Sequence, residues 1–149
     1  MTAHQRVTMR TVALAVLAGI LGCRSGCDDC SDVPPPPPPV ATICGGDFRI
    51  GDIVEWAAAI DYPYDVDEFL VDPLEVPMEL YVRVYGEAYG IDTVFEIIDP
   101  FGTVLDIVDD TIGRDPDGWY LLDVCGPWIV RVYAYDDATG PYDLVTEGI

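Results

Sequence analysis

Residues 126–144 read GPWIVRVYAYDDATGPYDL, and the tetrapeptide VRVY within this stretch also occurs at 82–85. In both copies valine alternates with arginine and tyrosine, which is the period-two pattern of a strand with one face in the core and one in water. We expect the valines to face inward and the arginines and tyrosines to face outward. The sequences around the copies do not align as full repeats. Two strands with the same packing role therefore explain the repetition better than a duplicated ligand motif.

The rest of the later chain continues this pattern. Short alternating or β-branched runs are separated by Pro, Gly and Asp turns about every eight to twelve residues, which is typical of an all-β sandwich. DPFG at 99–102 has proline in the favoured second position of a tight turn and predicts a hairpin. The predicted strands are 53–60, 68–71, 79–85, 93–98, 104–108, 119–124, 128–135 and 142–146. We predict an all-β fold, a jelly-roll-like antiparallel β-sandwich of about eight strands.

Three spaced motifs carry a family resemblance. Residues 65–71 (DVDEFLV) show a D-x-D-x-F strand opening, and residues 95–110 (FEIIDPFGTVLDIVDD) contain a D-P-x-G-x-x-L hairpin. Residues 126–146 supply a V-R-V strand, a Thr-Gly turn and a Y-x-L ending. In this order, and over nearly all of 52–146, the motifs resemble those of the bacterial pre-peptidase C-terminal domain family.

The resemblance implies a β-sandwich without catalytic activity. Domains of this family assist secretion or solubility, or bind matrix and polymer substrates, and some bind Ca²⁺. This sequence departs from the family pattern in two ways. It contains no peptidase, and it adds the pair Cys44 and Cys125.

The first 22 residues resemble a bacterial lipoprotein signal peptide. Arg6 and Arg10 precede an apolar run at 11–22, which is too short to span a bilayer. The run ends in ILGC, which resembles a lipobox and makes Cys23 the expected lipidated N-terminus. Residues 23–42 include six consecutive prolines and would form an extended stalk before a domain at 43–149. The alternative is an ordinary secreted protein that another peptidase cleaves.

The five cysteines fit export to an oxidising compartment. If Cys23 carries lipid, four cysteines remain to pair. Cys44 and Cys125 bracket the later part of the chain, so we predict a structural disulfide between them. Cys27 and Cys30, in CDDC, could form a small local disulfide. Two thiols alone are a weak signal for zinc, because a structural zinc site takes four ligands.

The chain is strongly acidic. It has 27 acidic and 7 basic residues, for a formal net charge of −20, and every acidic residue follows the apolar run. Nucleic-acid binding needs a basic surface, so this charge argues against it. Divalent cations are natural small partners of such a surface. A solvated acidic face, or adaptation to a salty habitat, would give the same composition.

The side chains available in the domain restrict its chemistry. Residues 43–149 contain no Ser, Lys, His, Asn or Gln. Ser-His-Asp and Cys-His arrangements therefore cannot be assembled, and zinc hydrolysis lacks its imidazole ligands. A pair of carboxylates could in principle cleave glycosides, but a chain this acidic contains such pairs in any case. We predict that the protein is not an enzyme.

Two acidic clusters are candidate Ca²⁺ sites, because Ca²⁺ needs only oxygen ligands. Neither cluster matches the spacing of an EF-hand, and Asp is common in turns that hold no ion. The favoured cluster, in and beside a loop, comprises Asp106, Asp109, Asp110, Asp115 and Asp117. The weaker alternative, around the turn before a strand, comprises Asp61, Asp65 and Asp67. Ca²⁺ is the one cofactor that we consider.

Six tyrosines could form a platform for sugar rings or a peptide, since aromatic side chains are efficient contact residues. They are Tyr62, Tyr64, Tyr85, Tyr89, Tyr133 and Tyr135. We favour the alternative that these tyrosines cover cross-strand neighbours on the sheets.

The preferred functional hypothesis is a non-catalytic protein of the bacterial cell envelope that displays one acidic β-sandwich for interaction. It would be lipid-anchored in the outer membrane, on the periplasmic or the surface face. Its partners would be the membrane, through the N-terminal lipid, and an envelope protein or an extracellular polymer. The alternative hypothesis is a Ca²⁺-dependent module that binds a carbohydrate or protein polymer.

Overall fold

The computed structural model describes residues 4–7, 41–111 and 113–149. The expected apolar run of the signal peptide, Cys23, Cys27, Cys30 and the predicted stalk as far as Val40 lie outside the described residues, whereas Thr42, the predicted end of the stalk, begins a short strand. Within the described residues no helix is long and apolar enough to cross a membrane.

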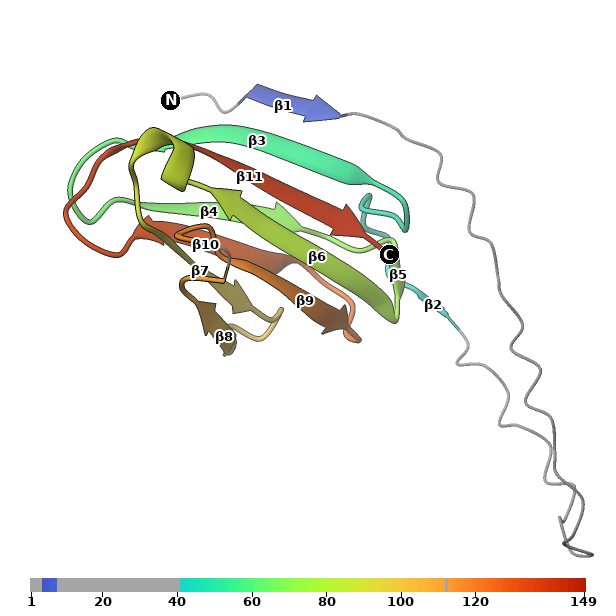
Figure 1. The fold of residues 1–149 in the computed structure, drawn as a ribbon. Coiled ribbons are helices and arrows are strands. Elements are labelled where there is room, and N and C mark those ends of the chain that lie inside the picture. Colours follow the sequence, from blue (N-terminus) through green and yellow to red (C-terminus); the bar gives the residue numbers. More distant parts are fainter. Residues whose placement is uncertain (1–3, 8–40, 112) are drawn as a thin grey trace, which may run out of the picture.

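The fold is an all-β sandwich of two antiparallel sheets (Figure 1). The five-stranded sheet has the order β1 (His4–Val7), β3 (Ile53–Ile60), β11 (Gly140–Gly148), β6 (Met78–Tyr85) and β9 (Asp117–Leu122). The four-stranded sheet has the order β4 (Val66–Val71), β10 (Trp128–Ala134), β7 (Thr93–Ile98) and β8 (Val104–Val108). A two-stranded ladder joins β2 (Thr42–Ile43) to β5 (Glu75–Val76), and one 3₁₀ turn, η1, covers Glu87–Tyr89.

The chain passes from one sheet to the other at most connections. β3, β6, β9 and β11 belong to the first sheet, whereas β4, β7, β8 and β10 belong to the second. This alternation gives the predicted jelly-roll-like sandwich. All eight predicted strands are present, with ends that differ by a few residues. β11 extends beyond its prediction because it pairs on both sides, with β3 and with β6. The short strands β2 and β5 were not predicted, because two residues carry no alternation.

The two VRVY copies lie in opposite sheets, one in β6 and the other in β10. Their four valines, Val82, Val84, Val130 and Val132, are each 0% exposed and meet in one core. The arginine between each pair of valines stays partly exposed on the outer face. The predicted orientation is therefore confirmed, and the repetition reflects two strands that close the same core from opposite sides.

Aromatic side chains fill much of the core between the sheets. Trp128 and Tyr142 are 2% and 1% exposed, and Phe95 is fully buried. Phe69 packs edge-on against Tyr142, with ring centroids 6.4 Å apart. Burying large rings from both sheets removes much apolar area from water, which is the main stabilising contribution in a domain of this size.

A disulfide joins Cys44 to Cys125, as predicted from the cysteine pattern. Cys44 follows β2 and donates its N–H to the carbonyl of Leu74, at 2.7 Å. Cys125 lies between β9 and β10. The bond therefore ties the segment that enters the domain to the connection before the second VRVY strand. At one side edge of the first sheet, β1 pairs with β3 (Figure 1).

Candidate functional site

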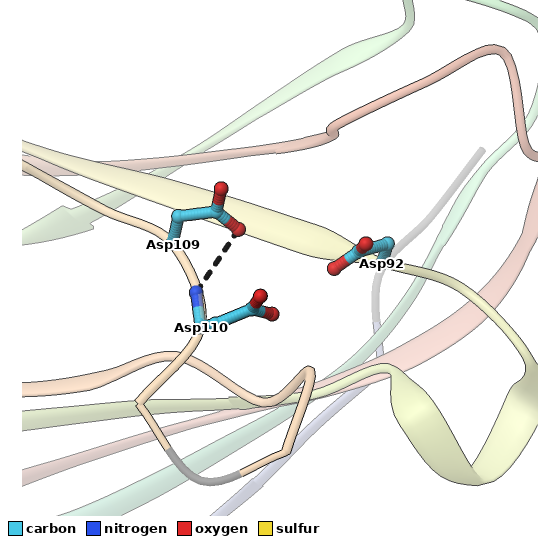
Figure 2. Close-up of side chains that lie close together, drawn as sticks. All are labelled: Asp92, Asp109 and Asp110. Atoms are coloured by element: carbon cyan, nitrogen blue, oxygen red, sulfur yellow. Dashed lines mark hydrogen bonds between the residues drawn. The ribbon is translucent and has the colours of Figure 1, made fainter.

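One group of carboxylates in the described chain has the spacing of a metal site. The side chains of Asp92, Asp109 and Asp110 each place an oxygen within 4.8 Å of the other two. Asp92 immediately precedes β7, and the other two follow β8, the hairpin partner of β7. Figure 2 shows the carboxylates of Asp92 and Asp110 pointing toward each other, while Asp109 accepts the N–H of Asp110 at 3.0 Å.

Asp92 is the best-held member of this acidic cluster. Its backbone carbonyl accepts the N–H of Tyr135 at 2.9 Å, which fixes its position at the end of the sandwich. Its Oδ1 atom is buried, and within the described residues no hydrogen-bond partner reaches it. Burial, followed by the charges of Asp110 and Asp109, raises the pKa of the Asp92 carboxyl, against a lowering effect of Arg114. Arg114 thus acts on this carboxylate without forming an ion pair with it, since both ion pairs among the described residues belong to Arg131.

The three other carboxylates of the favoured Ca²⁺ set have local partners instead. Asp106 accepts the hydroxyl of Tyr120 at 3.2 Å. Asp115 accepts two backbone N–H groups at the start of η1, at 2.9 and 2.8 Å. Asp117 accepts the hydroxyl of Tyr81 at 2.9 Å. The structure therefore brings together two of the five predicted residues and adds Asp92.

The weaker set of carboxylates serves the turn before β4 and the core. Asp65 accepts the N–H groups of Asp61 and Val66 at 2.9 and 3.0 Å, which stabilises the turn. Asp67 accepts the hydroxyl of Tyr142 at 2.7 Å. Burial raises the pKa of Asp67, and the hydrogen bond from Tyr142 opposes the rise. These three carboxylates are not grouped at metal-binding distances.

The acidic cluster fits a hard cation better than any chemistry that needs a nucleophile or a base. Three carboxylates offer up to six oxygens, and Ca²⁺ takes six to eight ligands from carboxylates, carbonyls and water. The buried, unpartnered oxygen of Asp92 would gain a positive partner. Sequence reasoning missed Asp92 because it is 17 residues from Asp109 and follows no acidic run. A hairpin prediction that aligned β7 with β8 could have placed Asp92 beside Asp109 and Asp110.

The six tyrosines of the candidate platform do not share one surface. Tyr85 lies on the outer face of the five-stranded sheet and Tyr133 on the outer face of the four-stranded sheet. The guanidinium of Arg83 lies 4.5 Å from the centre of the Tyr85 ring, and the hydroxyl of Tyr133 donates to Glu96 at 3.3 Å. These two rings cover neighbours on their sheets, as the favoured alternative proposed. The remaining four tyrosines lie in turns or in η1.

A second surface, which sequence reasoning also missed, lies on the outer face of β6 and β9. A shallow groove of about 420 Å³ is lined by Glu79, Trp119, Tyr120 and Leu121; we call it the β9 groove. The ring of Trp119 packs on that of Tyr81, with centroids 4.8 Å apart. Trp119 is 61% exposed and Leu121 is 58% exposed, so apolar side chains remain in water beside a carboxylate.

Two solved structures share this fold. The chain is similar to the pre-peptidase C-terminal domain of a collagenase from Bacillus anthracis, with a TM-score of 0.53 and 14% identity. That match covers 67% of this chain and 91% of the collagenase domain. A periplasmic inhibitor of g-type lysozyme from Aeromonas hydrophila matches with a TM-score of 0.51 and 13% identity, over 65% of this chain and 86% of the inhibitor. No protein-family model and no curated protein matches the chain.

These likenesses concern the fold. The pre-peptidase C-terminal-like sandwich that the three sequence motifs imply is therefore confirmed as an architecture. The functions of the two neighbours do not transfer at this level of identity, since one fold supports many functions.

Proposed function

We propose that the protein is a non-catalytic, lipid-anchored protein of the bacterial cell envelope whose acidic β-sandwich binds another protein. The observation that carries this proposal is the outer face of β6 and β9, where Trp119 and Leu121 are exposed among carboxylates. Exposed aromatic and aliphatic side chains with charged neighbours are typical of protein interfaces. The restricted side-chain chemistry of 43–149 supports binding rather than catalysis.

The proposed location is the outer membrane, with the lipid on Cys23 and 23–42 as the stalk. Removal of the residues before Cys23 would take β1 away and leave β3 at the edge of its sheet. The apolar run and ILGC support this arrangement. The neighbours are a periplasmic protein and a domain of a collagenase, and both fit an envelope or extracellular location.

Phase partitioning tests the anchor. We expect Cys23→Ala to move the protein from the detergent phase to the aqueous phase, because the acyl chains are then absent. Cys27→Ala is the matched control and is expected to remain in the detergent phase. Partitioning of Cys23→Ala with detergent would contradict the lipoprotein hypothesis.

Photo-cross-linking in cells tests the interaction. A photoreactive amino acid replaces Leu121 in the β9 groove, Leu70 on the opposite outer face, or Tyr64 in a turn. We expect an adduct of defined mass that protease digests and glycosidases leave intact. Its absence at all three positions would contradict a protein partner, whereas an adduct that only glycosidases digest would indicate a polymer.

A second candidate function is the Ca²⁺-dependent binding of a carbohydrate or protein polymer. The observation in its favour is the buried, unpartnered oxygen of Asp92 beside Asp109 and Asp110. If Ca²⁺ binds the folded state alone, a concentration one hundred times the Kd adds about 2.7 kcal/mol of stability.

Thermal melts with and without millimolar Ca²⁺ test this second function. We expect Ca²⁺ to raise the Tm of the wild type, and Asp92→Asn to remove most of the increase. Asp123→Asn, at an exposed carboxylate outside the cluster, is expected to show the same Ca²⁺-dependent increase in Tm as the wild type. An unchanged wild-type Tm, at matched ionic strength, would eliminate the Ca²⁺-dependent module.

A further inference from the structure

The β9 strand has a free backbone edge beyond Asp117, whose outward N–H and C=O are bonded to the hydroxyl of Thr111 at 3.2 Å. In the described part of the chain it pairs with β6 on one side and with no strand on the other. Val84 donates its N–H to the carbonyl of Pro116 at 3.0 Å, which sets the phase of this antiparallel ladder. Because such bonds alternate along the strand, the N–H and C=O groups of Trp119 and Leu121 point away from β6. They are therefore available to another strand.

The side chains at this edge form a recognition surface. Trp119 lies across from Tyr81, and Leu121 lies across from Glu79, all on the outer face of the sheet. Tyr81 supports the Trp119 ring and is itself held by Asp117 through its hydroxyl, at 2.9 Å. Trp119 is thus presented on a packed support, which lowers the entropy lost on binding.

The charge of the groove selects the ligand. The Glu79 carboxylate is exposed, and both ion pairs found in the described residues belong to Arg131 on the other sheet. An aromatic face beside a carboxylate favours an arginine or lysine side chain, through cation–π and ionic attraction together. Arg83, on the same outer face, lies over the ring of Tyr85 and is opposite Asp117 in the ladder. The chain's net charge of −20 adds long-range attraction for a basic partner.

The composition of β9 also leaves its edge unprotected. Natural edge strands are often blocked by lysine, proline or a bulge. β9 has the sequence DGWYLL and contains none of these residues. The comparable edge of β8 has a register shift in its pairing with β7, at Ile97 and Ile98. Of these two edges, β9 is therefore the better template for strand addition.

We propose that the β9 edge accepts an extended, basic segment of a partner protein as an additional strand. One arginine or lysine of that segment lies over Trp119, with Glu79 as its counter-charge. Backbone hydrogen bonds to Trp119 and Leu121 supply affinity, and the β9 groove supplies the preference for a basic side chain. The inference rests on the proposed function and names the surface and the chemistry of the partner.

Peptide binding to the full chain in mild detergent tests the inference. The probe is a fluorescent seven-residue peptide that alternates valine with arginine, and its comparison peptide carries glutamate at each arginine position. We expect saturable binding of the arginine peptide, weakened at high salt, and no binding of the glutamate peptide. Trp119→Ala should weaken binding about tenfold and Glu79→Gln about threefold, as expected for an aromatic anchor and one exposed charge.

Matched variants separate this edge from general surface effects. Phe101→Ala, Glu55→Gln and Ile107→Thr alter exposed residues elsewhere, and we expect each to bind the peptide within about twofold of the wild type, as additivity at distant sites implies. Leu121→Thr is the counterpart of Ile107→Thr, since both native side chains are 58% exposed, and should bind more weakly. Hydrogen exchange of the unmodified chain gives an independent readout: the peptide should protect the amides of Trp119 and Leu121.

Each contrary result overturns the inference. These results are no peptide binding, equal binding of the glutamate peptide, equal losses in the control variants, or no protection of the two amides. A neutral hexasaccharide that competes with the peptide at Trp119 would assign the groove to sugar. If the peptide does not bind at the β9 edge but cross-linking in cells still yields a protein adduct, the inference about the edge fails and the proposed function stands. If the peptide binds at the edge but cells yield no adduct, the proposed function fails instead.

Discussion

Arg83 and Arg131 occupy the same place in two identical tetrapeptides but have different surroundings. Arg131 binds Glu68 through Nε and Nη2, at 3.0 and 2.9 Å, and Glu96 through Nη1, at 2.8 Å. Arg83 lies over the ring of Tyr85 instead. The side chain of Glu96 is 14% exposed, so water reaches its carboxylate less than an exposed one and the contact with Arg131 matters more. The position in the strand determines that both arginines face outward, and the neighbouring strands determine what each one contacts.

The loss of stability on truncating each VRVY side chain to alanine should be larger for the buried valines than for the partly exposed arginines. We expect Val84→Ala and Val132→Ala each to cost about 1–3 kcal/mol, from lost methyl groups and the cavity left behind. Arg83→Ala should cost less than about 1 kcal/mol. Arg131→Ala should cost about 1–2 kcal/mol, because it leaves Glu96 without its counter-charge and with the Tyr133 hydroxyl alone as a partner. Denaturant melts of the four variants measure the order, and larger losses for both arginines than for the valines would contradict the packing.

Asp67 should make the stability of the folded domain depend on pH. Its pKa is raised in the folded state, so the carboxyl binds its proton more tightly there than in the unfolded chain. The associated stability is present at low pH and is lost as the pH rises through the raised pKa. We expect the wild type to lose stability relative to Asp67→Asn as the pH rises above about 4, the usual pKa of an aspartate in an unfolded chain. Unfolding free energies on both sides of this pH measure the difference, and a flat difference would contradict the raised pKa.

The controls for Asp67 separate charge from hydrogen bonding. Asn retains an oxygen that can accept the hydroxyl of Tyr142, whereas Ala does not. Asp67→Ala should therefore lose about 1–3 kcal/mol at every pH, because the buried hydroxyl is left without its acceptor. Asp123→Asn, at an exposed carboxylate, should leave the pH profile close to that of the wild type.

The ladder of β2 with β5 is too short to be stable by itself. Two residue pairs connect the strands, Thr42 with Val76 and Ile43 with Glu75. Phe48 adds a buried ring, and Gly46 passes so close to the carbonyl of Asp72 that a side chain would not fit. The disulfide between Cys44 and Cys125 holds this entering segment against the connection between β9 and β10.

Removing the disulfide should destabilise the domain without changing its fold. The two cysteines are 81 residues apart in sequence. Closing a loop of this length removes entropy from the unfolded chain and so raises its free energy by about 4–5 kcal/mol in the chain-entropy model, and measured effects are often smaller. We expect Cys44→Ala with Cys125→Ala to lose about 2–4 kcal/mol in denaturant melts.

A reductant provides the control for the double variant. It should lower the stability of the wild type by a similar amount and leave the double variant unchanged. Mass mapping of the unreduced wild type should recover the peptides of Cys44 and Cys125 joined. Recovery of both as free thiols would contradict the bond.

The whole chain has far more carboxylates than cations, with a formal net charge of −20. In the folded state these charges are concentrated on one compact surface, where they repel one another. Salt screens such repulsion over a Debye length that falls from about 10 Å at 0.1 M to about 3 Å at 1 M. The protein should therefore be more stable in salt, which also fits a salty habitat.

Raising NaCl from low ionic strength to about 0.5 M should increase the Tm by roughly 4 °C or more, which corresponds to about 1 kcal/mol for a domain near 100 residues. CaCl₂ at matched ionic strength is the comparison, because any increase beyond that of NaCl reports specific binding. A Tm that falls with NaCl would show that attractive ion pairs outweigh the repulsion.

Period-two alternation predicted the strands from sequence because it is a local property of a chain with one buried face. The same alternation placed the valines of both VRVY copies inside, and counting cysteines paired Cys44 with Cys125. The three motifs, in their order, pointed to the sandwich architecture. None of these inferences required knowledge of which strand lies beside which.

The sites depended on long-range pairing, which a local pattern does not contain. The alignment of β7 with β8 brought Asp92 to Asp109 and Asp110, while Asp106 and Asp117 were bound by tyrosines of other strands. The pairing of β6 with β9 placed Trp119 on Tyr81 and left the β9 edge free. Residues distant in sequence become neighbours only when the sheets form, so the tertiary structure alone decided where the acidic cluster and the β9 groove lie.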